Sequence, residues 1–117
     1  MGKGDYLGEF EQITMLALVR LGSNAYGMTI RRELAERIKR EVSIGAIYTT
    51  LERLERKGFV ASHVGEPTKE RGGRAKRYFK ILAPGNKALD ESWNNVQRMR
   101  DGTPLGGTLA SIVGGLS

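Results

Sequence analysis

The sequence predicts a mostly α-helical α+β domain, in which three helices are followed by a two-stranded hairpin and then by a fourth helix. Three observations predict this order. Apolar residues recur at helical spacing in four segments, glycines end two of these segments, and two short strand-like runs flank a loop. The chain has 117 residues and no cysteine, a length that supports a single core without disulfides or zinc. We expect the domain at residues 9–82 and the last helix at residues 83–101.

The first helix is expected at residues 9–21, because apolar side chains cover most of its circumference, and Gly22 ends it. Such a pattern predicts a helix enclosed by the core. Ser23 or Asn24 is expected to cap the second helix, whose outer face is charged. The apolar stripe of the second helix repeats every four residues, at Tyr26, Ile30, Leu34 and Ile38.

The third helix is expected between a cap at Ser43 and a terminating Gly58. Its buried stripe is predicted at Ile44, Ile47, Leu51 and Leu54. The opposite face carries small or polar side chains, namely Gly45, Ala46, Thr49, Thr50 and Arg53. Two acidic residues on this helix would repel phosphate, so we expect them to face away or to orient arginines: Glu52 and Glu55, with Arg53 and Arg56.

A hairpin is expected after the third helix, with strands at residues 59–64 and 77–82 around a loop at residues 65–74. Residues 66–80 hold six Lys or Arg and two Glu, so four of the net +6 charges of the chain lie there. The hairpin therefore has a basic tip.

The fourth helix opens at Ala83 with Pro84 in its first turn. Outside the domain, residues 1–8 and 102–117 hold eight of the 16 glycines. We expect a flexible N-terminus and a disordered tail, since each glycine in a helix costs about 1 kcal/mol relative to alanine. The apolar stripe of the fourth helix consists of Leu89, Trp93, Val96 and Met99.

No catalytic, metal or cofactor site is expected. One histidine and no cysteine exclude thiol catalysis and zinc clusters. The glycines of the hairpin tip are not followed by the Lys and Ser or Thr of a phosphate-hydrolysis loop, and nothing arranges Ser, His and Asp as a triad. No uncharged stretch reaches the ~18 apolar residues of a membrane span. We therefore expect a cytoplasmic protein that is not an enzyme and does not enter a membrane.

The third helix and the hairpin together predict a DNA-binding surface. A helix with small outward side chains can enter a major groove about 12 Å wide, and a basic loop beside it can follow phosphates or reach a minor groove. The candidate residues of the recognition helix are Ser43, Gly45, Ala46, Tyr48, Thr49, Thr50 and Arg53. Those of the hairpin, or wing, are Lys69, Arg71, Gly72, Gly73, Arg74, Lys76 and Arg77.

Three motifs are specific as an ordered set: Tyr26-Gly27 at the second helix, residues 43–48 with 51–60 in the third helix and first strand, and residues 71–79 in the hairpin. Through them the chain resembles the PadR family of bacterial winged-helix transcriptional regulators, and its single helix after the wing resembles the short branch of that family. The resemblance implies a winged helix-turn-helix fold and a homodimer built by the last helix. It also implies repression of promoters under the control of a small effector.

Three side chains have competing interpretations. Tyr48 lies next to the buried stripe and can pack there, or it can approach a phosphate, as the resemblance implies. Trp93 can anchor a dimer interface or stack a planar apolar ligand. His63 lies on a strand and is expected to be at the surface or loosely packed, the competing interpretation being a sensor of pH.

Three hypotheses for function remain open at this point. The leading one is a sequence-specific repressor that binds double-stranded DNA as a homodimer at an inverted repeat and responds to a small apolar or aromatic effector. The second is an architectural nucleic-acid binder without base readout. The third is a small-molecule binding module centred on Trp93.

Overall fold

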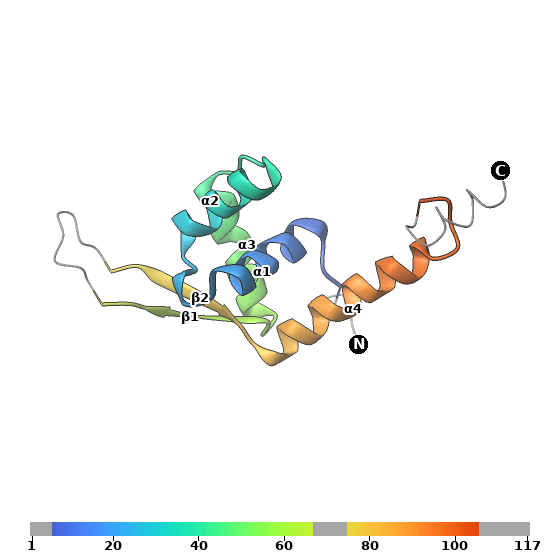
Figure 1. The fold of residues 1–117 in the computed structure, drawn as a ribbon. Helices are drawn as coiled ribbons and strands as arrows, with labels where there is room; N and C mark the ends of the chain where they lie inside the picture. Colours follow the sequence, from blue (N-terminus) through green and yellow to red (C-terminus); the bar gives the residue numbers. More distant parts are fainter. Residues whose placement is uncertain (1–5, 67–74, 106–117) are drawn as a thin grey trace.

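The computed structural model describes residues 6–66 and 75–105. In Figure 1 the first three helices gather into one body, the hairpin extends from one side of it, and the last helix leaves on the other side. This is the predicted order, and the predicted fold class is confirmed. The elements are α1 (Glu9–Leu21), η2 (Gly22–Asn24), α2 (Gly27–Ile38), α3 (Ile44–Arg56), β1 (Val60–Val64), β2 (Arg77–Ile81) and α4 (Ala83–Arg100).

The ends of the chain lie only in part within the described residues. The amide of Gly8 donates to Glu11 Oε1 at 2.9 Å, and the amide of Thr103 donates to the carbonyl of Arg100 at 3.0 Å. Residues 1–5 and 106–117 lie outside the described residues, so the flexible N-terminus and the disordered tail stay predictions.

The core lies between the first three helices and the base of the hairpin. Each of these helices packs against the other two, and α1 also packs against β2 and α4. A half-buried ammonium, Lys57 Nζ, lies 3.0 Å from the buried carboxylate of Glu11 and ties the end of α3 to α1. The largest fully buried side chains are Phe79, Met15, Ile30, Ile47, Leu51, Leu54, Val60 and Thr14.

The start of α2 differs from the prediction. Ser23 and Asn24 form the short turn η2 instead of a cap, and Tyr26 is the N-cap. The hydroxyl of Thr29 accepts a hydrogen bond from the amide of Tyr26 at 3.0 Å and donates to the carbonyl of Asn24 at 2.6 Å. Thr29 thus supplies one half of a capping box from inside the first turn, a role that the choice of a cap residue by type does not reveal.

One side of α1 is open to solvent, so the expectation of an enclosed helix is wrong. Met15 and Leu18 are buried in the core, whereas Leu16 is 47% exposed and Val19 is 51% exposed. No described part of the chain covers these two side chains. Periodicity reports that a helix face is apolar, but it does not report what covers that face.

The hairpin is antiparallel, with Val60 paired to Ile81 and Val64 paired to Arg77. Its first strand starts one residue later than predicted, because the amide of Phe59 donates to the carbonyl of Leu54 at 3.0 Å and so closes the end of α3. Gly58 makes this turn with a φ of 81°, which glycine adopts at little cost. The predicted end of the helix at Gly58 is confirmed.

An exposed ion-pair network joins α1 to α2. Glu33 Oε2 accepts hydrogen bonds from Arg20 Nε at 2.8 Å and from Arg37 Nε at 2.9 Å. The hydrogen bond from Arg20, followed by the one from Arg37, lowers the pKa of Glu33 below its ordinary value.

Replacing Glu33 with glutamine is expected to destabilise the fold at neutral pH and to matter less in acid. Because folding lowers the pKa of Glu33, its ionised form stabilises the fold above the ordinary value of 4.5, and this contribution is lost as the pH falls through the lower folded value. Urea unfolding at a series of pH values should show the free energies of wild type and Glu33→Gln converging in acid. The control is Glu36→Gln, because the Glu36 carboxylate makes no ion pair with the described residues. A difference between wild type and Glu33→Gln that stays constant from neutral to strongly acidic pH would contradict the prediction.

Candidate nucleic-acid interface

The first turn of α3 presents small side chains to solvent. Ser43 is its N-cap, as predicted, and the Oγ of Ser43 accepts a hydrogen bond from the amide of Ala46 at 3.0 Å. Gly45, Ala46 and Thr49 are exposed and lie on neighbouring positions of the helix surface. No bulky side chain at these positions keeps the turn away from a grooved partner.

Thr50 is buried, so its predicted outward orientation is wrong. Only 5% of Thr50 is exposed, because it stands three residues after Ile47 and four before Leu54, which are both fully buried. A residue at the border of an apolar stripe can belong to either face, and Thr50 belongs to the core. Of the two neighbouring threonines, only Thr49 is exposed.

Tyr48 packs its ring between α2 and the hairpin. A Cβ atom added to Gly27 would lie 2.8 Å from the Tyr48 hydroxyl oxygen, so the ring rests directly on the backbone at the start of α2. The centroid of the Tyr48 ring also lies 6.1 Å from that of the Phe79 ring. The aromatic ring of Tyr48 therefore packs against the rest of the protein, which is the first of the two interpretations given above. Contact between the hydroxyl and a phosphate stays a prediction.

The acidic side chains of α3 face the hairpin. Glu55 Oε1 lies 2.9 Å from Arg77 Nη2, and Glu52 Oε2 lies 4.0 Å from Arg77 Nη1. Of the two expected arrangements, the one in which they orient Arg53 and Arg56 is therefore wrong, and the one in which they face away from DNA stays a prediction. Arg53 is exposed and lies 3.8 Å from Glu11 of α1.

Two of the candidate wing residues lie at the described base of the hairpin. Lys76 Nζ lies 5.4 Å from the ring centroid of Tyr26, and Arg77 pairs with Glu55. The other candidates belong to the segment 67–74 and lie outside the described residues: Lys69, Arg71, Gly72, Gly73 and Arg74.

Aromatic packing fastens the base of the hairpin to the start of α2. Tyr78 meets Tyr26 edge to face with centroids 5.4 Å apart, and it stacks on His63 at 5.6 Å. Phe79 is buried in the core, and its amide donates to the carbonyl of Ala25 at 2.9 Å. His63 is exposed, as predicted. Aromatic packing and one backbone hydrogen bond therefore attach the base of the hairpin to the start of α2.

The apolar stripe of α4 divides into a buried and an exposed part. Leu89 is buried in the core of its own chain, so it does not belong to a free interface. Trp93, Val96 and Met99 are 59%, 45% and 78% exposed. The physical reason is that α4 runs past the body of the domain, as Figure 1 shows. Among the described residues, the end of α4 is contacted by the turn that follows it, where Arg100 donates to the carbonyl of Leu105 at 2.6 Å.

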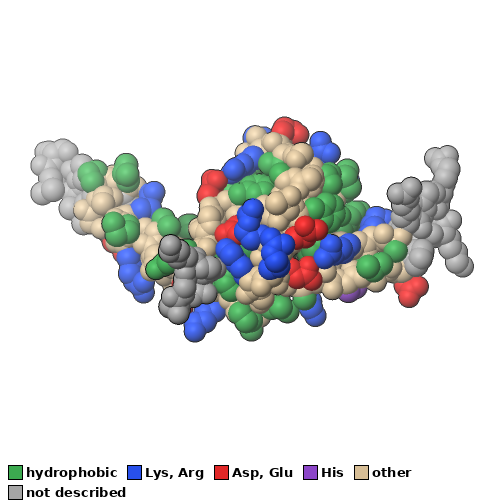
Figure 2. All heavy atoms as spheres, turned by 180° about the vertical axis from the view of Figure 1, so that it is seen from behind, with side chains coloured by type: hydrophobic (Ala, Val, Ile, Leu, Met, Phe, Trp, Pro, Cys, Tyr) green, Lys and Arg blue, Asp and Glu red, His purple; other side chains and the backbone are tan. Residues whose placement is uncertain are grey.

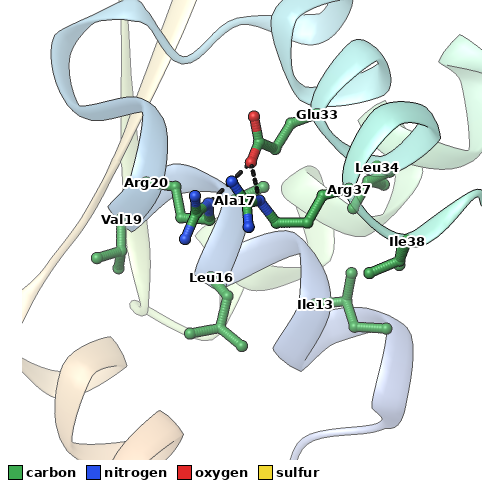
Figure 3. A pocket seen from close by; sticks show the side chains of 9 residues that line it. All are labelled: Ile13, Leu16, Ala17, Val19, Arg20, Glu33, Leu34, Arg37 and Ile38. Atoms are coloured by element: carbon green, nitrogen blue, oxygen red, sulfur yellow. Dashed lines mark hydrogen bonds and ion pairs between the residues drawn. The ribbon is translucent and has the colours of Figure 1, made fainter.

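A groove between α1 and α2 was not expected from the sequence. Figure 3 shows its apolar wall and, along one edge, Glu33 between Arg20 and Arg37. Its volume is about 450 Å³. The all-round apolar pattern of α1 is the signal that could have revealed it. The apolar lining residues are Ile13, Leu16, Ala17, Val19, Leu34 and Ile38.

The described surface carries both signs of charge. On the face shown in Figure 2, Lys and Arg side chains lie beside Asp and Glu on the central body. Within residues 6–66 and 75–105, no cluster of three His, Asp or Glu side chains could hold a metal ion. No helix in the same part of the chain is both long and apolar enough to span a membrane.

The three helices and the hairpin form a winged helix-turn-helix domain, which α4 extends. Residues 15–91 match the model of the transcriptional regulator PadR-like family. The chain belongs to this family of transcriptional regulators and is not an enzyme.

Solved structures with the same fold agree with this assignment. A PadR family transcriptional regulator from Eggerthella lenta is 25% identical, with 80% of this chain and 81% of that chain covered and a TM-score of 0.64. A PadR-like transcription factor from Bacteroides fragilis is 25% identical, with coverage of 77% and 84% and a TM-score of 0.63. Bacillus subtilis PadR in complex with operator DNA is 19% identical, with coverage of 71% and 46% and a TM-score of 0.58, a likeness of fold alone. No curated protein matches the chain.

Proposed function

We propose that the protein is a sequence-specific DNA-binding repressor that acts as a homodimer on an inverted-repeat operator. The observation that carries the proposal is the capped start of α3, whose first two turns expose Gly45, Ala46 and Thr49. This helix packs against β1 of a hairpin whose connecting segment is rich in Lys and Arg in the sequence. A helix of this kind fits the major groove, where small side chains allow close approach to base edges. Bacillus subtilis PadR, which shares the fold, has been solved in complex with operator DNA.

The experiment that tests the proposal compares two labelled duplexes by fluorescence anisotropy at ~150 mM salt. One duplex comes from the region upstream of the gene, and the other is a shuffled sequence of equal composition. We expect the upstream duplex to bind about 10³-fold more tightly or better, as specific regulators do. Equal binding of both duplexes would contradict base readout at this operator and favour an architectural binder.

The proposed contacts divide between bases and phosphates. The first turn of α3 would meet base edges, while Ser43, Tyr48 and Arg53 would contribute hydrogen bonds to the DNA. The wing would neutralise phosphates. Its proposed contact residues are Lys69, Arg71, Gly72, Gly73, Arg74 and Lys76.

Replacing Arg71 and Arg74 together with alanine is expected to weaken binding to both duplexes and to flatten its salt dependence. Each phosphate contact contributes about −0.9 to the slope of log K against log [salt], so the slope should become less negative by about 1.8 per subunit if each arginine neutralises one phosphate. Anisotropy titrations at several salt concentrations measure this slope. Lys87→Ala removes a positive charge from an exposed position of α4 and should leave the slope unchanged. An unchanged slope in the double variant would mean that Arg71 and Arg74 of the wing do not neutralise phosphates, and it would contradict the proposed contact.

The proposal of a homodimer is supported by large apolar side chains that are exposed on two helices of the single chain. Trp93, Val96 and Met99 form an exposed stripe on α4, and Leu16 and Val19 are exposed on α1. Large apolar side chains grouped in this way mark interaction surfaces. We assign the stripe of α4 to a second copy of the chain, because two-fold symmetry would also place two copies of α3 on an inverted repeat.

Replacing Trp93 with glutamate is expected to convert the dimer into a monomer, because a carboxylate in an apolar interface would lose its hydration without gaining a partner. Analytical ultracentrifugation at micromolar concentration measures the change. Asn94→Glu introduces a negative charge at the next, exposed position of α4, away from the stripe, and should remain a dimer. If Trp93→Glu sediments like wild type, α4 does not form the interface.

A small apolar or aromatic effector is proposed to bind beside Trp93 in this dimer and to release the DNA. Trp93 is the only tryptophan of the chain, so its fluorescence reports on this site alone. Quenching by planar hydrophobic compounds, together with a loss of operator affinity at the same concentrations, would support the effector site. Quenching without any change in affinity would contradict a regulatory role.

A further inference from the structure

A closed ring of hydrogen bonds connects the recognition helix to both strands of the hairpin. Arg77 Nε donates to Ser62 Oγ at 3.1 Å, and Arg77 Nη2 donates to Glu55 Oε1 at 2.9 Å. Ser62 Oγ in turn donates to Glu55 Oε2 at 2.9 Å. Each of the three side chains therefore contacts the other two, and they come from β2, α3 and β1.

The guanidinium of Arg77 is engaged on several sides at once. It lies over the ring of Phe79, 5.1 Å from the centroid, and Glu52 Oε2 lies 4.0 Å from its Nη1. Hydrogen bonds between charged groups are the strong ones, and two donors of one planar group fix its orientation. If Arg77 turned towards a phosphate, the carboxylate of Glu55 would lose this charged partner.

The ring also accounts for two carboxylates on a helix that we propose to face DNA. Glu52 and Glu55 would repel phosphates if no cation neutralised them. Arg77 of β2 places one positive charge beside both carboxylates, 2.9 Å from Glu55 and 4.0 Å from Glu52, so their negative charge is partly neutralised within the protein. These acidic residues thus have a role that is compatible with DNA binding.

A second set of contacts holds the hairpin to the start of α2. Tyr26 and Tyr78 form an isolated bridge and an edge-to-face ring pair, and the amide of Phe79 donates to the carbonyl of Ala25. The base of the hairpin is therefore fastened to α2 through its aromatic residues and to α3 through Arg77. Two attachments to different helices fix an angle that one attachment would leave free.

We infer that Arg77 is a positioning residue, which holds the hairpin at a fixed angle to the recognition helix through Glu55 and Ser62 and does not contact DNA. The inference rests on the proposed function, because it assigns the role of Arg77 within DNA binding. It replaces the sequence-based prediction that Arg77 is one of the wing residues bound to phosphate.

Glu55→Gln distinguishes a positioning role of Arg77 from a direct contact between Arg77 and phosphate, because the Glu55 carboxylate cannot itself attract phosphate. If Arg77 positions the hairpin, Glu55→Gln and Arg77→Gln should each weaken binding to the upstream duplex by about tenfold, and the double variant should be no weaker than either. Lys80→Gln removes the same charge from an exposed position of the same strand and should change the affinity by less than about twofold. Glu55→Gln binding as tightly as wild type, or more tightly, would overturn the inference.

A double variant that exchanges the two residues, Glu55→Arg with Arg77→Glu, tests whether the ion pair itself matters for DNA binding. The exchange restores an ion pair between α3 and β2, so the double variant should regain most of the affinity lost by Arg77→Glu alone. If Arg77 bound phosphate, a glutamate in its place would repel DNA in both variants, and the absence of rescue would overturn the inference. All affinities are compared at a temperature at which circular dichroism shows every variant folded.

Hydrogen exchange of the free protein tests the ring without DNA. Backbone amides of β1 and β2 should exchange at least about fivefold faster in Glu55→Gln and Arg77→Gln than in wild type and Lys80→Gln. Unchanged exchange would overturn the inference even if DNA binding were lost. If the wild type fails to prefer the upstream duplex, the proposed function fails, and this exchange experiment alone decides whether the ring holds the hairpin.

Discussion

Replacing Ala46 with glutamate is expected to lower the affinity for the upstream duplex by at least about 100-fold, the equivalent of losing one or two good base contacts. Ala46 is exposed in the first turn of α3, where a small side chain allows close approach. A glutamate there would hold the helix away from the base edges and would repel the phosphates on both sides of the groove. Anisotropy titration with the upstream duplex measures the loss.

Ala46→Glu should leave the fold intact, so a loss of DNA binding in this variant would not be caused by unfolding. Ala46 is the third residue after the N-cap Ser43, and Ser followed three residues later by Glu is the capping box that stabilises helix starts. Acidic groups are also favourable near a helix N-terminus. The melting temperature of Ala46→Glu should therefore equal or exceed that of wild type.

Asn94→Glu is the control for charge, since it adds one negative charge at an exposed position of α4. It should bind the duplex within about twofold of wild type, because long-range repulsion between exposed charges is screened at this salt concentration. If Ala46→Glu and Asn94→Glu bind equally well, α3 does not enter the groove and another face of the domain must meet the DNA.

Local signals explain why most element boundaries could be predicted from the sequence. Ser43, Gly22, Gly58 and Pro84 act through the backbone within one or two residues, so their effect hardly depends on the rest of the fold. The strands differ from the prediction by one residue, and the larger difference is the start of α2. There a threonine inside the helix supplies the capping interaction, and preferences for cap residues do not include that position.

Tertiary contacts explain why the site was predicted less well. Thr50 and Leu89 stand at the borders of apolar stripes, and only the neighbouring elements decide which side of the helix is covered. The sequence groups Arg77 with the basic wing because its sequence neighbours are basic. Its partner Glu55 lies 22 positions earlier in the chain, and no local pattern links the two.

The apolar sequence patterns of α1 and α4 predict more buried side chains than the single chain has. On α1 the pattern predicts burial, yet Leu16 and Val19 are exposed, and on α4 Trp93 and Met99 are exposed as well. A hydrophobic pattern records every surface that is covered in the functional assembly. The difference between pattern and burial is therefore an argument for the proposed dimer that does not depend on the DNA-binding site.

Replacing Gly85 with alanine is expected to destabilise the fold by about 2–3 kcal/mol and to lower the melting temperature by roughly 10–15 °C. A Cβ atom at Gly85 would overlap the carbonyl oxygen of Phe59 and would lie 3.0 Å from both the Phe59 carbonyl carbon and Ile81 Cγ1. Backbone atoms cannot move aside as a flexible side chain can. Moreover, the same carbonyl accepts the amide of Leu82 at 2.9 Å, so moving it would weaken the junction between the hairpin and α4.

Gly45→Ala is the matched control, because it makes the same substitution in the first turn of another helix. There the new Cβ would meet only the Ser43 Oγ at 3.9 Å, so the better helix propensity of alanine should stabilise the fold by up to ~1 kcal/mol. Thermal unfolding followed by circular dichroism should therefore move in opposite directions for the two variants. If Gly85→Ala melts at or above the temperature of wild type, α4 does not start in close contact with Phe59. The direction in which α4 carries Trp93 away from the body would then depend on contacts other than this glycine.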